Sequence, residues 1–249
     1  MAAIVGIGGG AMREGETLPI DRAALALTGK RAPRALFIPT ASGDDRDYWA
    51  RFRDIYGRRL GCETDALFLL GEPPSLAQRE DAILGADLVY VGGGNTLKMM
   101  RRWRRLGVDA LLREAHRRGT VLAGLSAGCI CWFADGHSDS LSYYDPTDWD
   151  YIAVKGMVSF AAVGCPHYDG ETLGIKREAS FHAMMRRRGG IGIGIDNHAA
   201  LAIVDGRYRV LAAREGAGVH RVSARAGKHA VDRHLGGATE GPTRQLLAR

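Results

Sequence analysis

The stretch VLAGLSAGCICWF (residues 121–133) decides how this chain is interpreted. It contains the pattern G-x-S-x-G, in which Ser126 lies two residues from Gly124 and two from Gly128. An apolar run precedes the pattern and small and apolar residues follow it, so the order strand, turn, helix is expected. In that order the pattern is typical of a nucleophile elbow, a cramped turn that raises the serine hydroxyl above a sheet. Taken alone, the five residues are equally compatible with an ordinary glycine-rich turn.

The rest of the chain places this turn in an α/β fold. Short apolar runs alternate with amphipathic stretches through the first two thirds, as in β–α units. The alternation predicts a mainly parallel sheet covered by helices on both faces, followed by a C-terminal hairpin at the Asp205-Gly206 turn. Strands are expected at 3–7, 35–39, 64–69, 87–91, 121–124, 200–204, 207–211 and 218–222, and helices at 48–60, 76–83, 96–103 and 109–118.

Two later segments do not fit the β–α pattern. Residues 136–152 (GHSDSLSYYDPTDWDYI) are polar, aromatic and rich in turn formers, which predicts a long loop over one edge of the sheet. Residues 223–249 are basic and weakly patterned, which predicts a C-terminal tail of low order. The chain shows no internal repeat and no clear linker, so residues 1–222 are expected to form a single α/β domain.

Composition argues against several classes of protein. The 34 Lys and Arg residues against 28 Asp and Glu give a net charge of +6, but the basic residues are spread over several expected helices without a nucleic-acid-binding module, so no nucleic-acid partner is expected. No run reaches the ~18 apolar residues of a membrane span, and the first residues do not resemble a leader. A cytoplasmic protein without a membrane partner is therefore expected.

Cofactors and metals are not expected either. The four cysteines show no metal-ligand spacing, and no H-x-x-x-H pattern occurs. Gly6, Gly8 and Ala11 match a dinucleotide-binding pattern after a strand, but the charged residues and the proline that follow disfavour the helix that such a site needs.

A serine nucleophile needs a positioned base, which is nearly always histidine. His167, in VGCPHYDGE, is the strongest candidate, because it follows an apolar run and a proline at the end of an expected strand, where Ser126 also emerges. The other histidines are His116 and His182 in helical stretches, His137 and His198, which remain possible, and His220, His229 and His234 in the weakly patterned end.

Oxyanion donors are expected from two places. GADLVYVGGGNTLKM (residues 85–99) places glycines at the C-terminal end of another strand, where ligand crevices of α/β sheets lie. There the amides of Gly93 and Gly94 can approach a reacting carbonyl, beside the amide of Ala127 at the start of the helix after Ser126.

The segments GGGNT (residues 92–96), GLSAG (124–128) and PH (166–167), in this order, resemble the peptidase E and cyanophycinase family of serine peptidases. The resemblance covers residues 3 to about 211 and implies a fold similar to class I glutamine amidotransferases. It implies that Ser126 is the nucleophile, His167 the base, and the amides of Gly93, Gly94 and Ala127 the oxyanion donors. The implied reaction is hydrolysis of a small peptide or amide through an acyl-enzyme, as in aspartyl dipeptidases.

The third catalytic member is where this chain departs from the family. The resemblance implies an acid after GIGID (residues 192–196), but the aligned residue is Asn197. An asparagine can hold an imidazole tautomer but lacks the charge that stabilises an imidazolium, so an acid at this position is expected to raise activity. A shift of one residue would make Asp196 the acid, and Asp139 in the long loop is a third candidate.

The substrate and the alternatives stay open at this point. A cation for an acidic substrate is expected from Arg177 or Lys176, with further contributions from Tyr143, Asp145 and Trp149. The alternatives are a catalytically weak or silent relative that binds a small ligand or partner, and an α/β-hydrolase esterase, for which Asp139 or Asp150 before His167 gives the right chain order. A homodimer is also compatible with the sequence.

Overall fold

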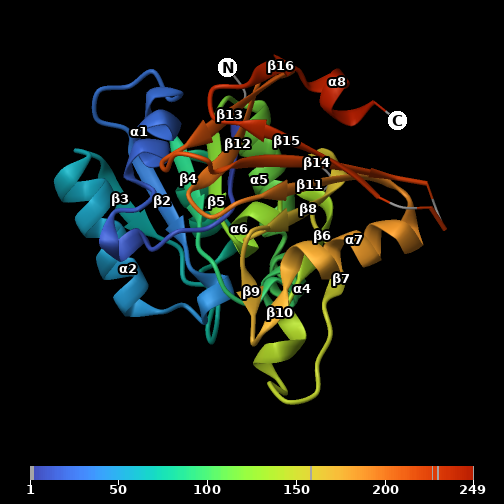
Figure 1. The fold of residues 1–249 in the computed structure, drawn as a ribbon. Coiled ribbons are helices and arrows are strands. Elements are labelled where there is room, and N and C mark those ends of the chain that lie inside the picture. Colours follow the sequence, from blue (N-terminus) through green and yellow to red (C-terminus); the bar gives the residue numbers. More distant parts are fainter. Residues whose placement is uncertain (1–2, 158, 226, 229, 249) are drawn as a thin grey trace.

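Two sheets form the scaffold of the chain in the computed structural model, which describes residues 3–157, 159–225, 227–228 and 230–248 (Figure 1). The larger sheet has the strand order β16-β13-β12-β1-β5-β4-β2-β3, and its five strands from β1 to β3 are parallel. Its strands are β1 (Ala3–Ile7), β2 (Arg34–Ile38), β3 (Glu63–Ala66), β4 (Leu88–Val91), β5 (Val121–Leu125), β12 (Ala199–Val204), β13 (Arg207–Ala212) and β16 (Glu240–Pro242).

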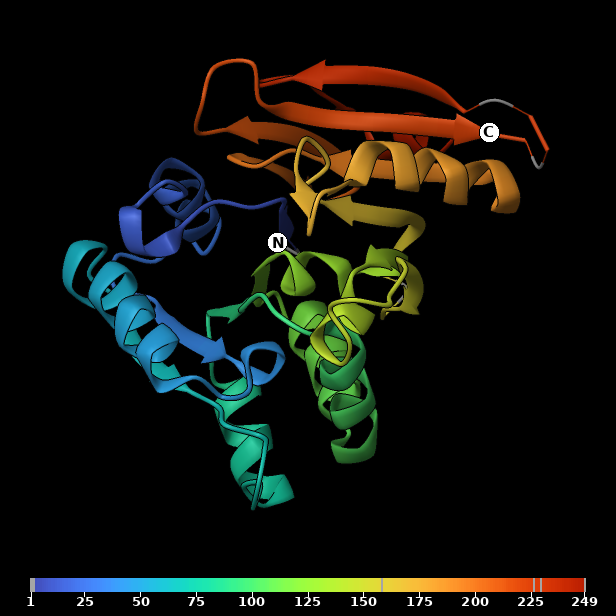
Figure 2. The same cartoon turned by 60° about the horizontal axis from the view of Figure 1, so that its bottom comes forward.

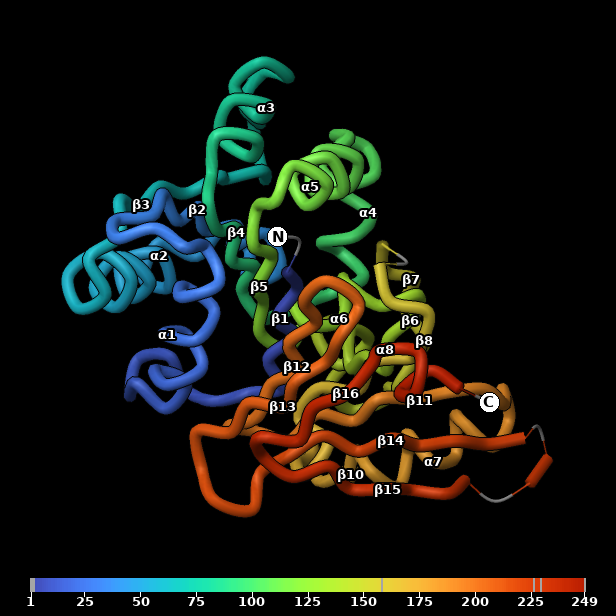
Figure 3. The backbone as a smooth tube through the Cα atoms, turned by 90° about the horizontal axis from the view of Figure 1, so that it is seen from above, coloured from blue at the N-terminus to red at the C-terminus, as the bar shows by residue number. Residues whose placement is uncertain are grey.

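Helices cover both faces of the parallel part, and its central strands β1, β4 and β5 are buried at every position. Leu36 and Val89 belong to the core cluster that contains α4 and α5, whereas the next residues, Phe37 and Tyr90, belong to the cluster that contains α1 and α2. Figure 3 shows these two helix pairs on opposite sides of the strands. The helices are α1 (Leu18–Ala26), α2 (Arg46–Phe52) with its π-helical continuation η3 (Arg53–Arg59), α3 (Leu76–Leu84), α4 (Thr96–Leu106) and α5 (Val108–Arg117).

The smaller sheet has the order β15-β14-β11-β8-β6-β7 and packs between the β12–β13 hairpin and helix α7. Figure 2 shows α7 running along this sheet. Its strands are β6 (Phe133–Ser138), β7 (Ile152–Lys155), β8 (Phe160–Pro166), β11 (Gly190–Ile195), β14 (Gly218–Ala224) and β15 (Val231–Gly236); α7 spans Arg177–Arg188. Shorter elements are η1 (Met12–Glu14), η2 (Thr40–Ser42), α6 (Ala127–Ile130), η4 (Ser140–Tyr143), β9 (Glu171–Thr172), β10 (Ile175–Lys176) and α8 (Thr243–Leu247).

The α/β class, the parallel strands and the covering helices are confirmed. The hairpin at Asp205-Gly206 is also confirmed, with β12 and β13 in antiparallel register. Among the described residues, no helix combines the length and hydropathy needed to cross a membrane.

Three expectations differ from the structure. The long loop at 136–152 contains the end of β6, the turn η4 and the start of β7, the edge strand of the smaller sheet. Strand β14 pairs with β11 and β15 rather than extending the hairpin, so a second sheet forms. The segment expected to be a tail contributes β15 to the smaller sheet and β16 to the larger one, because backbone pairing orders it despite its weak side-chain pattern.

Candidate active site

Ser126 and His167 are attached to consecutive residues at the carboxyl end of β1. The Ser126 amide donates to the Ile7 carbonyl at 3.0 Å, and the His167 amide donates to the Gly8 carbonyl at 3.1 Å. Ser126 comes directly after β5, and His167 comes directly after β8. One short segment therefore holds the ends of β5 and β8, which belong to different sheets, beside the carboxyl end of β1, and no hydrogen bond joins the Ser126 and His167 side chains among the described residues.

The next residue, Gly9, positions the third member of the group. Gly9 forms a parallel bridge with Asn197, and its carbonyl accepts from the amide of His198 at 2.9 Å. A side chain on Gly9 would place its Cβ 2.1 Å from Asn197 Oδ1 and 2.3 Å from His167 Nδ1. Gly9 is thus packed directly against the contact between the imidazole and the amide.

The turn at Ser126 has the strained backbone of a nucleophile elbow. Its φ is 56° and its ψ is −107°, a conformation that non-glycine residues rarely adopt. Both flanking glycines are required by close packing: a Cβ on Gly124 would lie 2.4 Å from the Gly128 carbonyl oxygen, and one on Gly128 would lie 2.2 Å from the Val91 carbonyl oxygen. The G-x-S-x-G pattern is therefore the condition for a tight β5–α6 turn, and the strain lies at the serine.

His167 contacts Asn197, and Asn197 contacts a carboxylate. The Nδ1 atom of His167 lies 2.6 Å from Asn197 Oδ1, and Asn197 donates from its backbone N and from Nδ2 to Asp169 Oδ1 at 2.8 and 2.9 Å. A carboxylate only accepts, so Asp169 fixes the amide with Oδ1 toward the imidazole. Nδ1 of His167 must then carry the proton, which leaves Nε2 with a free lone pair.

The environment keeps His167 neutral. Burial lowers the pKa of this imidazole, and the positive charge of Arg177 lowers it further, while the hydrogen bond to Asn197 acts in the opposite direction. A neutral imidazole with its free lone pair on Nε2 is the form that accepts a proton from a hydroxyl.

Of the three expected oxyanion donors, Gly93 and Ala127 lie next to Ser126, whereas Gly94 has a role in loop packing. Gly93 lies beside the serine, since a Cβ on it would be 3.4 Å from Ser126 Cβ, and its N–H points to the Tyr48 hydroxyl at 3.5 Å. Ala127 is the first residue of α6, where the amide has no partner within the helix. At Gly94, φ is +133° and a Cβ would lie 2.2 Å from the Ala41 carbonyl oxygen, so this glycine is needed for loop packing.

Neither carboxylate alternative to Asn197 contacts His167 among the described residues. Asp196 Oδ2 accepts from the Gly218 amide at 3.0 Å and lies 3.2 Å from His220 Nε2. Asp139 pairs with Arg177 and accepts from the Thr172 hydroxyl at 3.1 Å. The geometry therefore brings Asn197, and not Asp196 or Asp139, to the imidazole.

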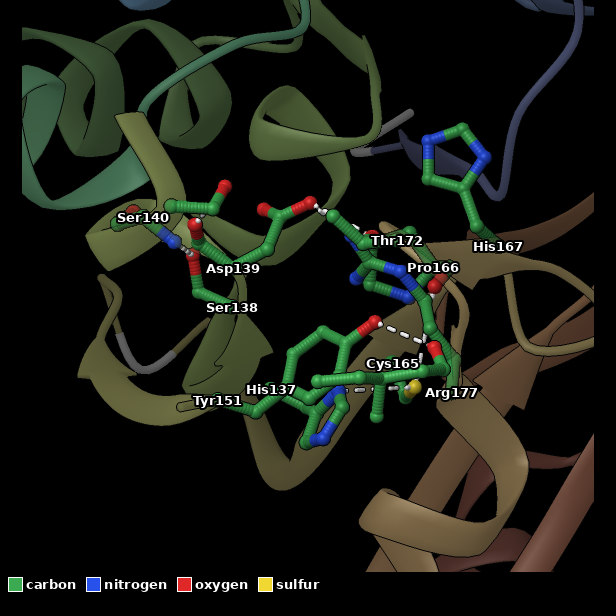
Figure 4. Close-up of polar contacts among 12 residues, drawn as sticks. His137, Ser138, Asp139, Ser140, Tyr151, Cys165, Pro166, His167, Thr172 and Arg177 are labelled. Atoms are coloured by element: carbon green, nitrogen blue, oxygen red, sulfur yellow. Dashed lines mark hydrogen bonds and ion pairs between the residues drawn. The ribbon is translucent and has the colours of Figure 1, made fainter. Parts of the chain in front are cut away.

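Arg177 lies near the loop that carries His167. Its amide donates to the Gly170 carbonyl at 3.0 Å, and the Gly170 amide donates to the His167 carbonyl at 2.9 Å. The Arg177 side chain is 3% exposed; Nη2 contacts Asp139 and Thr172, but Nε and Nη1 have no hydrogen-bond partner among the described residues. Figure 4 shows Asp139, Thr172 and Arg177 side by side, with His167 at the edge of the group.

The remaining candidates have other surroundings. His137 is buried, stacks on Tyr151 and lies 3.0 Å from the Ser180 hydroxyl. Lys176 and Tyr143 are exposed, Asp145 accepts from the Thr147 amide in a turn, and Trp149 packs edge-on against Tyr151. His229 lies outside the described residues.

Sequence reasoning missed Asp169. The signal for it was an acidic residue two positions after His167, in the same loop PHYDG. The loop turns back on itself through the hydrogen bond from the Gly170 amide to the His167 carbonyl. This turn brings the carboxylate to Asn197, which comes from a different strand.

The sequence profile of Peptidase family S51 matches residues 4–211. The chain belongs to Peptidase family S51. The uncharacterized peptidase YgaJ of Bacillus subtilis (strain 168) is 35% identical over 225 residues, which are 89% of this chain and 92% of that protein. Peptidase E of Escherichia coli O6:K15:H31 is 32% identical over 104 residues, 41% of this chain and 42% of its own length.

Two solved structures share the fold. A peptidase from an acI-B1 Actinobacterium matches with a TM-score of 0.72 and 21% identity, covering 97% of each chain. A peptidase E protein from Listeria monocytogenes EGD-e matches with a TM-score of 0.60 and 19% identity, covering 94% of this chain and 99% of its own. Family membership makes this chain a serine peptidase and disfavours the esterase and silent-binder alternatives.

Proposed function

We propose that this S51 peptidase cleaves short peptides with Ser126 as nucleophile, His167 as general base and Asn197 as the residue that orients the base. The observation that carries the proposal is the attachment of Ser126 and His167 to the consecutive carbonyls of Ile7 and Gly8. The ends of β5 and β8, which are distant in sequence, are thereby hydrogen-bonded to the same end of β1. A nucleophile and its base require such rigid backbone positioning.

The chemistry runs in two halves. His167 Nε2 takes the proton of the Ser126 hydroxyl while the oxygen attacks the scissile carbonyl, and the N–H group of Ala127 stabilises the oxyanion. The N–H group of Gly93 becomes a second donor when it exchanges its 3.5 Å contact with the Tyr48 hydroxyl for the oxyanion. The imidazolium then gives its proton to the leaving amine, and the C–N bond breaks to leave an acyl-serine. Water, deprotonated by the same Nε2, attacks the acyl group; the C–O bond to the serine breaks and the serine oxygen recovers the proton.

Asp169 supplies the charge that Asn197 lacks. In a Ser-His-Asp triad the carboxylate accepts directly from Nδ1–H and stabilises the imidazolium. Here the carboxylate is one residue further away and accepts from the Asn197 amide, which in turn accepts from Nδ1–H. Hydrogen bonds in such a chain polarise one another, so part of the effect of the Asp169 charge reaches the imidazole.

The preferred substrate in this proposal has a carboxylate near the scissile bond. Arg177 is buried and close to the His167 loop, and two of its guanidinium nitrogens lack partners. A guanidinium N–H without a partner can donate a charge-assisted hydrogen bond to a carboxylate. An aspartyl dipeptide, whose acidic side chain lies next to the bond to be cleaved, supplies such a group.

Labelling with a fluorophosphonate probe tests the nucleophile and the base. Wild-type protein is expected to be labelled at Ser126, and both Ser126→Ala and His167→Ala are expected to abolish labelling. Ser159→Ala, which removes an exposed serine, is the matched control and is expected to label normally. Labelling that survives Ser126→Ala rules out the proposed nucleophile.

Substrate preference is tested separately with Asp-Leu and Asn-Leu dipeptides. Wild-type protein is expected to cleave the aspartyl dipeptide faster, and Arg177→Lys, which keeps the charge but not the planar fork, is expected to narrow the ratio. Equal rates on the two dipeptides contradict the role of Arg177 and leave the proposal for Ser126 and His167 intact.

A further inference from the structure

A cluster of two histidines and a buried aspartate lies outside the proposed catalytic group. His220 of β14 and His234 of β15 are directly opposite each other in the antiparallel register, so both side chains are on the same face of the smaller sheet. Asp196 follows the end of β11, the strand on the other side of β14. One potential ligand atom from each of the three residues lies within 4.8 Å of the other two.

The distances within the cluster fit a shared cation. Asp196 Oδ2 lies 3.2 Å from His220 Nε2. Ligand atoms bound to one tetrahedral zinc ion at about 2.0–2.2 Å are separated from each other by roughly 3.3 Å. The largest gap that remains to be closed is therefore at most about 1.5 Å, and His234 is exposed and has the freedom to close it.

The second nitrogen of His220 is already oriented as in a metal site. His220 Nδ1 lies 3.1 Å from Asp232 Oδ2, and that oxygen also accepts from the Tyr168 hydroxyl at 2.8 Å. A histidine that binds a metal usually donates its other N–H to a carboxylate, which fixes the tautomer and strengthens the ligand. Asp232 holds this position and leaves Nε2 directed at Asp196.

One oxygen of the aspartate is independent evidence for a ligand. Asp196 is 5% exposed, and its Oδ1 is buried without a hydrogen-bond partner among the described residues. A buried carboxylate oxygen without a partner carries a desolvation cost, and a cation held by the carboxylate would offset that cost.

We propose that Asp196, His220 and His234 form a binding site for a zinc-type divalent cation that links β11, β14 and β15. One carboxylate and two imidazoles are ligands that suit zinc, cobalt and nickel rather than magnesium or calcium. Three protein ligands leave a fourth position for water. None of the three ligands takes part in the proposed peptidase chemistry, although Asp196 directly precedes Asn197. The ligands are 24 and 14 positions apart in the sequence, a spacing that matches no short metal motif.

Titration of the metal-stripped full-length chain, free of any polyhistidine tag, tests the site. Zinc chloride is expected to bind at one strong site per chain by calorimetry, cobalt to give the absorption bands of a tetrahedral complex, and magnesium not to bind. Removing one of three ligands is expected to weaken zinc binding at least tenfold. Because His234 is exposed, His234→Ala is the variant that should preserve the fold, as circular dichroism will check.

His182→Ala is the matched control. His182 belongs to a neighbouring group with Glu178 and Asp232, so it reports whether zinc binds there instead. The proposal expects His182→Ala to bind zinc normally and Asp196→Asn to bind it weakly. It is overturned if wild-type protein shows no saturable zinc binding, if His234→Ala binds as well as wild type, or if His182→Ala is the variant that loses the site.

Discussion

Two histidines contact consecutive residues: His167 contacts Asn197, and His220 contacts Asp196. The pKa of the His167 imidazole is lowered, whereas the pKa of the His220 imidazole is raised. His167 meets the neutral amide of Asn197, and burial, followed by the charge of Arg177, lowers its pKa. At His220 burial also acts to lower the pKa, but the hydrogen bond and charge of Asp196, followed by Asp232, outweigh it and raise the pKa. An amide therefore leaves one imidazole free to accept a proton, whereas two carboxylates make the other a site for positive charge.

The largest expected effect is a loss of peptidase activity in Ser126→Ala without any change in zinc binding at the His220 site. Ser126→Ala removes the proposed nucleophile and is expected to lower peptidase kcat by ~10⁴-fold or more, because the proposed base then has no hydroxyl to activate. Serine and alanine differ by one oxygen at this turn, so the melting temperature and the zinc affinity should stay at wild-type values. Steady-state kinetics, thermal melting and zinc titration of the same preparation check this. A large fall in melting temperature would instead indicate a structural serine.

Gly9→Ala is expected to disturb the His167 site from the backbone side. The added Cβ would lie 2.1 Å from Asn197 Oδ1 and 2.3 Å from His167 Nδ1, so both side chains must move. A displacement of about 1 Å in catalytic geometry costs about 10²-fold in rate, and that loss in kcat is expected here. Gly57→Ala is the control, because its Cβ would meet nothing closer than 3.3 Å. Wild-type kinetics for Gly9→Ala would mean that the contact between His167 and Asn197 does not matter for turnover.

Asn197→Asp places a carboxylate next to His167, as Asp196 is next to His220. It is expected to lower the peptidase activity about tenfold. The new carboxylate faces Asp169 Oδ1, which now accepts from Asn197 Nδ2, and two adjacent carboxylates repel each other. Part of the loss is offset because the new charge stabilises the imidazolium, which is why the effect is smaller than for Gly9→Ala. Measuring kcat/KM on one dipeptide gives the comparison.

The double variant Asp169→Asn/Asn197→Asp is the control for that repulsion. It exchanges the two groups, so that an amide at position 169 donates to a carboxylate at position 197. Activity is expected to return to the wild-type level or above it. If the double variant is no better than Asn197→Asp alone, the Asp169 contact is not what makes an asparagine necessary.

The sequence predicted the parts of the fold that local pattern determines. Strands β1, β2, β4 and β5 and the turn at Ser126 follow from apolar runs and glycine spacing, which act over a few residues. The second sheet could not be predicted, because the pairing of β14 with β11 and β15 is non-local and β15 has a weak apolar pattern.

The candidate site divides in the same way. Ser126 and His167 stand out in their own segments, whereas the contact of Asn197 with Asp169 joins two loops 28 positions apart. Without Asp169, an acid at position 197 is expected to raise activity; with Asp169 in place the expected sign reverses. The cluster of Asp196, His220 and His234 could not be predicted from the sequence either. His234 lies in the segment expected to be a tail, and His220 lies just before that segment.

The smallest expected effect is a shift in the pH profile of the peptidase. As the proposed base, His167 must be unprotonated, and its pKa is lowered from the ordinary value of 6.5, so the acid limb of kcat/KM is expected to have its midpoint below 6.5. Between the folded and unfolded pKa values the unfolded chain binds more protons at this residue, so its contribution to the free energy of unfolding falls as pH falls through the same range.

Exchanging the carboxylate at position 169 and the amide at position 197 is expected to shift the acid limb of the kcat/KM profile to higher pH. In Asp169→Asn/Asn197→Asp the negative charge lies directly at Nδ1 of His167, which favours the imidazolium, so the midpoint of the acid limb is expected to shift to higher pH. Profiles of kcat/KM for wild-type and double-variant protein, recorded across the range where histidine titrates, give the comparison. An unchanged midpoint would show that the titrating group is not His167, since no other imidazole among the described residues contacts Asn197 by a side-chain hydrogen bond.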